Sequence, residues 1–99
     1  MIRIKLIVVI YANPVGTSPD DVTLIRMLQL PFLPFIDTEF IWGDFMVAIR
    51  RIYYDDQARI LTANVNSEHA ETREQFAQLT ARYLAHGWQK PADITDDEG

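Results

Sequence analysis

Apolar side chains recur at every second position through most of the first 65 residues, and this spacing constrains the fold more than any other feature. A period of two places successive side chains on opposite faces of an extended strand. Four stretches follow the pattern, at residues 2–11, 22–30, 45–54 and 59–65. Turn-forming residues separate the first stretch from the second and the third from the fourth. We therefore expect an antiparallel four-stranded sheet made of two hairpins, with a short fifth strand possible within residues 38–42.

A single amphipathic helix is expected after Ser67, because the apolar spacing changes there to that of a helix. The residues on its less polar face are Thr72, Phe76, Leu79, Thr80, Tyr83 and Leu84. Asn66 or Ser67 can cap its start, and Gly87 can cap its end. The expected class is α+β, with this C-terminal helix packed on one face of the sheet.

The chain has 99 residues and no cysteine. Two domains would each be small enough to need disulfides or metals, so we expect one domain at residues 1–90. Residues 91–99 are expected to form an acidic flexible tail. Absence of cysteine excludes disulfides and thiolate catalysis, and it fits a reducing, cytoplasmic compartment. The first apolar run is broken by Pro14 and lacks a cleavage site, so we expect a strand there and no membrane segment.

The net charge of −5 argues against binding to nucleic acid or to anionic membranes. One strand favours nucleic-acid binding despite the net charge. It combines basic and aromatic side chains, as single-stranded nucleic-acid surfaces do, at Arg50, Arg51, Tyr53 and Tyr54. Strand alternation sends Arg51 and Tyr53 to one face and the other two residues to the opposite face. Nucleic-acid binding stays an alternative, and it would draw on the basic residues of a neighbouring strand, Arg3 and Lys5.

No catalytic constellation emerges from the sequence. His69 and His86 fall near opposite ends of the expected helix, too far apart to share a metal ion. The carboxylates of Asp37, Glu39 and Asp44 could form the site of a small enzyme, but their spacing matches no calcium loop, and a solvated rim is expected. We therefore expect a protein that is not an enzyme, with no catalytic residues, no cofactor and no metal.

The most unusual segment is residues 31–35, in which two prolines alternate with aromatic and aliphatic residues, followed by Phe40 and Trp42. Proline cannot donate a ladder hydrogen bond, so this segment crosses between strands rather than pairing as one. It either covers the sheet face opposite the helix or forms a contact surface, since aromatic anchors dominate interface energies.

One helix can shield only one face of a sheet, whereas apolar residues are expected on both faces. Those on the second face include Ile7, Val9, Tyr11, Ile25, Met27 and Ile52. Exposing them would forfeit about 1.5 to 3 kcal/mol for each large side chain. We therefore expect a non-catalytic interaction module that binds itself, as a homodimer, or another protein. Its expected contact residues are Phe32, Phe35 and Trp42.

Overall fold

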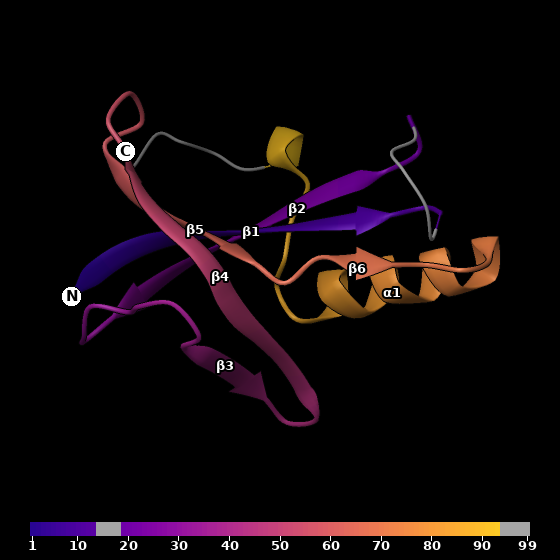
Figure 1. The fold of residues 1–99 in the computed structure, drawn as a ribbon, viewed down its shortest axis with the longest axis horizontal. Helices are drawn as coiled ribbons and strands as arrows, with labels where there is room; N and C mark the ends of the chain where they lie inside the picture. Colours follow the sequence, from indigo (N-terminus) through magenta and orange to yellow (C-terminus); the bar gives the residue numbers. More distant parts are fainter. Residues whose placement is uncertain (14–18, 94–99) are drawn as a thin grey trace.

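The computed structural model describes residues 1–13 and 19–93, which form one curled sheet and one α-helix (Figure 1). The strands are β1 (Ile2–Tyr11), β2 (Val22–Leu30), β3 (Glu39–Trp42), β4 (Phe45–Asp55), β5 (Ile60–Val65) and β6 (Glu68–His69). Helix α1 (Arg73–Ala85) and a 3₁₀ turn (Pro91–Asp93) follow. Residues 94–99 of the expected tail, and residues 14–18 of the loop between the first two strands, lie outside the described residues.

The strand order is β2-β1-β5-β4-β3, and β6 pairs with the end of β1. Three neighbouring pairs are antiparallel, but β1 and β5 run parallel to each other. The α+β class with one C-terminal helix is confirmed. The sheet is mixed rather than purely antiparallel, and it has more than the expected four strands, because the possible fifth strand is present as β3 and β6 adds a sixth. The hairpin of β1 and β2 joins the hairpin of β4 and β5 through the pairing of β1 with β5. These two strands run in the same direction, so the centre of the sheet is parallel.

The core lies on the face of β1 that carries its even-numbered residues. Ile4, Leu6, Val8 and Ile10 are all 0% exposed. The other strands and the helix end add large side chains to the same cluster, among them Leu24, Val47, Ile49, Val65, Tyr83 and Trp88. Burial of each large apolar side chain is worth about 1.5 to 3 kcal/mol, so this face holds the sheet and helix together.

Strand β4 contains a β-bulge that changes which side chains face the core. Between Ile49 and Arg51, the pairing advances two residues on β4 for one residue on β5, so Arg50 is the extra residue. Before Arg50 the odd-numbered residues of β4 face the core, and after it the even-numbered residues do. Ile52 returns to the core side, and Arg51 and Tyr53 lie together on the opposite face.

Helix α1 begins at Arg73 rather than shortly after residue 67. Its N-cap is Thr72, whose Oγ1 accepts a backbone N–H at 3.0 Å. The expected cap at Asn66 or Ser67 is wrong, because residues 68–69 are drawn out as β6 beside the end of β1. This tertiary pairing overrides the local capping signal, and it removes His69 from the helix.

The second face of the sheet is covered better than its composition suggests. Ile7, Val9 and Met27 are half-buried there, and Ile25 is 8% exposed. The chain after the helix runs along the outer edge of β2, where Ile25 and Gln89 exchange two backbone hydrogen bonds of 2.8 Å. The excess apolar surface therefore lies elsewhere, around β3.

Arg26 joins elements that lie at opposite ends of the strand order. It stands on the core side of β2, opposite Leu6. Its Nη1 donates a hydrogen bond to the backbone oxygen of His86 at the end of α1, and its guanidinium lies 4.7 Å from the ring centroid of Trp42 in β3. Burial lowers its pKa by desolvation, yet a guanidinium stays charged and is favoured near a helix C-terminus.

Gly87 makes room for this arrangement. Its φ of +88° is a conformation that side chains rarely adopt, and a Cβ added there would lie 2.9 Å from Nη1 of Arg26. The C-cap residue is His86, and Gly87 ends the helix directly after it, one residue beyond the cap and with an additional steric reason for a glycine.

We expect Gly87→Ala to lower the free energy of unfolding by about 2 kcal/mol, because alanine is strained at positive φ and its Cβ displaces the Arg26 guanidinium. Gly43→Ala is the matched control. Its φ is +67° and nothing lies within 4 Å of an added Cβ, so only the strain, about 1 kcal/mol, is expected. Urea denaturation measures both. Equal losses would show that the contact with Arg26 contributes nothing.

Candidate functional site

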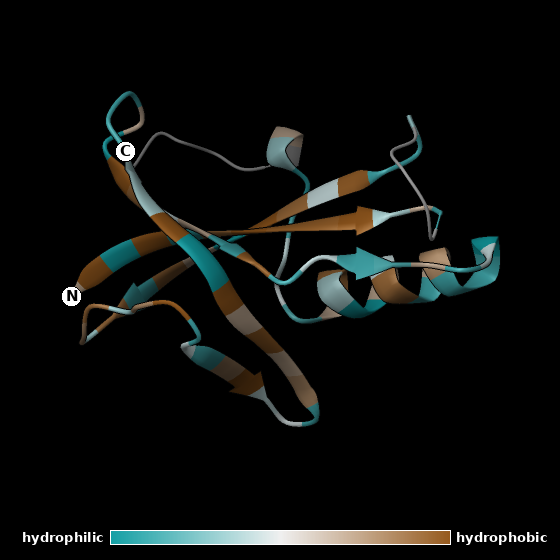
Figure 2. Cartoon of the chain, in the orientation of Figure 1, coloured by the Kyte–Doolittle hydropathy of each residue, from teal (hydrophilic) through white to brown (hydrophobic). Residues whose placement is uncertain are grey.

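Exposed apolar side chains gather in the loop between β2 and β3 and on the hairpin that follows it. Figure 2 shows hydrophobic residues in this loop and on β3. We call this set the apolar edge; its members and their exposed fractions are Phe32 (47%), Leu33 (65%), Phe35 (70%), Ile36 (44%), Ile41 (64%) and Met46 (48%). Four of them, at residues 32–36, lie in the loop, and the other two, Ile41 and Met46, lie opposite each other on the hairpin.

The loop is held by its own residues while its aromatic side chains face solvent. Pro34 is buried and anchors it. The backbone closes a tight turn in which the N–H of Thr38 donates to the oxygen of Phe35 at 3.0 Å, and the N–H of Phe35 donates to Thr38 Oγ1 at 3.1 Å. Asp37, at a φ of 73°, accepts a hydrogen bond from Arg50 at 3.0 Å. A loop fixed in this way loses little conformational entropy when it binds.

The three contact residues expected from the sequence occupy two different environments. Phe32 and Phe35 are exposed, as a contact role requires. Trp42 is half-buried, with its ring 6.2 Å from that of Phe40 and 6.0 Å from that of Phe45. Its ring therefore packs in an aromatic cluster against the core, with Arg26 over it, and does not join the other two.

Sequence reasoning missed Ile41 and Met46, which lie opposite each other on β3 and β4. The alternation of side chains along the hairpin could have shown that these two residues face solvent. If Phe40 and Trp42 face the core, the residue between them faces away, and so does its partner across the two-residue turn. The signal could be used only once β3 and β4 were known to pair.

Tyr83 is a buried ionisable group that serves the fold. Its side chain is 0% exposed, and its hydroxyl donates to Oε2 of Glu68 at 2.8 Å. Burial, and then the hydrogen bond and negative charge of Glu68, raise the pKa of the Tyr83 phenol far above its ordinary value. Its ring also packs edge-on against Phe45 and Trp88. Tyr83 thus ties α1 to β6 as a neutral group.

Two of the three carboxylates that could form an enzyme site pair with arginines on different elements. Asp37 pairs with Arg50, and Asp44 Oδ1 lies 3.9 Å from Nη2 of Arg82 on the helix. Within residues 1–13 and 19–93, no group of three histidines or carboxylates is close enough to hold a metal ion. The described surface therefore offers no observation in support of a carboxylate mechanism.

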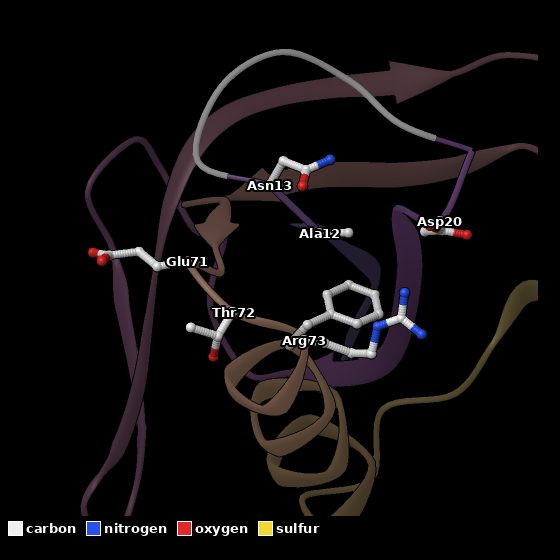
Figure 3. A pocket seen from close by; sticks show the side chains of 7 residues that line it. Ala12, Asn13, Asp20, Glu71, Thr72 and Arg73 are labelled. Atoms are coloured by element: carbon white, nitrogen blue, oxygen red, sulfur yellow. The ribbon is translucent and has the colours of Figure 1, made fainter.

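A hollow of about 390 Å³ opens at the start of α1 (Figure 3). Its lining includes Ala12, Asn13, Asp20, Glu71, Thr72, Arg73 and Phe76. The carboxylates of Asp20 and Glu71 point away from each other in Figure 3. Ligand sites require a few polar groups that converge on one point, and the carboxylates of Asp20 and Glu71 do not converge (Figure 3).

The face of the sheet opposite the core carries a small basic and aromatic group. Lys5, Thr62 and Tyr53 lie side by side on β1, β5 and β4. The guanidinium of Arg51 lies over the Tyr53 ring at 4.9 Å from its centroid. Arg50 is not part of this group, because the bulge directs it to Asp37.

Comparison of the chain with protein-family models, with curated proteins and with solved structures finds no match. In the parts of the chain that the structure describes, no helix is long and apolar enough to cross a membrane. A functional assignment therefore has to rest on the surfaces described above.

The buried Tyr83 predicts a loss of stability in alkali. In the unfolded chain a tyrosine loses its proton near pH 10, whereas folded Tyr83 keeps it, so the free energy of unfolding falls as the pH rises above about 10, by up to about 1.4 kcal/mol per pH unit. Urea denaturation at several alkaline pH values measures this slope.

Tyr83→Phe should be less stable at neutral pH and should show a shallower alkaline slope. Tyr54→Phe is the control, because Tyr54 is 59% exposed, and its slope should equal that of the unmodified chain. An unchanged slope in Tyr83→Phe would contradict the assignment.

Proposed function

We propose that this protein is a non-catalytic interaction module that binds a protein partner, either itself or another chain, through the apolar edge. The observation that carries the proposal is the set of six large apolar side chains exposed within residues 32–46, on the loop before β3 and on the β3–β4 hairpin. Together they expose roughly 600 Å², at the upper end of what monomeric proteins show. Patches of this size commonly mark interaction sites.

The energetics support the same conclusion. Leu33, Phe35 and Ile41 are each more than 60% exposed. Each large side chain left in water forgoes about 1.5 to 3 kcal/mol that a partner could recover by covering it. Aromatic residues on a fixed backbone are the commonest anchors of protein interfaces, and Phe32 and Phe35 have this form.

The double variant Phe32→Ser/Phe35→Ser tests the proposal. Both side chains are substantially exposed, so we expect the free energy of unfolding to change by no more than about 0.5 kcal/mol, while the affinity for the partner falls at least about tenfold. Light scattering over a concentration series measures self-association, and affinity capture with the chain as bait measures other partners.

Tyr54→Ser is the matched control, because it removes another exposed aromatic ring that is not a member of the apolar edge. It should leave association unchanged. A complex that the double variant binds as tightly as the unmodified chain does, or the absence of any complex, would contradict the proposal.

Single-stranded nucleic-acid binding is the second candidate, and the strand register favours it in one respect. It brings Lys5, Arg51 and Tyr53 onto one sheet face. Two observations count against it: the net charge is −5, and the Tyr53 ring that would stack on a base is covered by Arg51.

Oligonucleotide titrations at increasing salt separate the candidates. If the face binds nucleic acid, affinity falls steeply with salt, and Arg51→Ala weakens binding several-fold. Arg50→Ala is the control, because Arg50 lies outside that face and pairs with Asp37. We expect no salt-dependent binding from any of the three proteins. Tight binding that only Arg51→Ala reduces would instead support the second candidate.

A further inference from the structure

We infer that the partner at the apolar edge is a second copy of this chain, joined by antiparallel pairing of the two β3 strands about a two-fold axis at Ile41. This inference rests on the proposed function and names the occupant of the same surface. Three observations support it: β3 is an open edge of the sheet, the backbone N–H and C=O of Ile41 face that edge, and the side chains around Ile41 are apolar.

The two edges of the sheet differ in how they are covered. On the outer side of β2, Gln89 pairs with one residue, Ile25, in an isolated bridge. β3, in contrast, pairs only with β4 among the described residues, and Figure 1 shows no strand beyond it. Proteins usually protect an open edge with lysine, proline or a bulge. The sequence of β3, Glu39–Trp42, has neither lysine nor proline, and its pairing with β4 is regular, so its protection is limited to its length of four residues and the charge of Glu39.

The peptide groups of Ile41 point toward the open edge. The turn after β3 has two residues with a positive φ at Gly43 but not at Asp44, which is the pattern of a type II′ hairpin. In such a hairpin the flanking residues, Trp42 and Phe45, form a hydrogen-bonded pair. Because bonding alternates along the strand, the N–H and C=O of Ile41 face away from β4. Two such residues can exchange both hydrogen bonds across a two-fold axis.

Side chains favour this register over its neighbours. With Ile41 on the axis, Met46 and Ile41 of one copy continue into Ile41 and Met46 of the other as one apolar row. Glu39 then lies opposite Gly43 of the second copy. Shifting the axis to Glu39 would place like charges directly opposite each other, which is destabilising.

The interface extends beyond the strands. Antiparallel pairing brings the loop at residues 31–36 of each copy toward the turn at residues 43–44 of the other. The apolar edge of roughly 600 Å² then accounts for most of the approximately 800 Å² that each partner buries in a stable interface. The remaining roughly 200 Å² has to come from the backbone of β3 and from the turn that follows it.

Sedimentation and light scattering of the whole chain test the inference. We expect a dimer whose dissociation constant rises at least about tenfold in Ile41→Lys, because a charge replaces the central side chain. Gln29→Lys is the matched control, placed on the exposed side of β2, and it should dimerise normally. Unfolding curves should confirm that both variants fold, since Ile41 is 64% exposed.

Isotope-filtered NMR on a mixture of labelled and unlabelled chains reports the register. We expect a contact between the Hα atoms of Phe40 and of Trp42 in the other copy, which form a close, non-hydrogen-bonded pair. A dimer that survives Ile41→Lys but not Phe32→Ser/Phe35→Ser would overturn the β3 pairing and leave the proposed function standing. A chain that stays monomeric and captures a different protein would do the same. A chain that forms no complex at all would overturn both.

Discussion

The parallel pairing of β1 with β5 is the interaction on which the rest of the structure depends. It places β1 in the interior of the sheet, with β2 on one side and β5 on the other, so that four of its side chains are completely buried. It also joins two hairpins that would each be marginal alone. The same pairing directs the chain after β5 past the end of β1, where β6 forms and α1 can return over the core.

Arg26 and the aromatic cluster around Trp42 explain how so curled a sheet is closed. A charged side chain on the core face of β2 would be costly without partners. Here it contacts a helix carbonyl and an aromatic ring, and Gly87 leaves room for it. The cluster draws Phe40 and Trp42 inward, and alternation then turns Ile41 outward. Closure of the core and exposure of Ile41 and its partner Met46 are thus two results of one arrangement.

The interaction hypothesis depends on where the uncovered apolar surface lies. The sequence suggested the second face of the sheet, but there the side chains shield one another and Gln89 engages the edge of β2. The surface instead lies around β3, on a loop fixed by Pro34 and by the pair of Asp37 and Arg50. Local order with outward apolar side chains is what a preformed contact surface requires.

The sequence by itself determined the main strands, the end of the helix at Gly87 and the proline-rich crossing segment with Phe32 and Phe35, because periodicity, turn residues and proline act over a few neighbouring positions. Only the tertiary structure decided the parallel centre of the sheet, the bulge at Arg50 and the place of Trp42 inside and Ile41 outside. These depend on which strand edges meet. That choice is made by burial between segments far apart in the chain, and local patterns of alternation do not encode it.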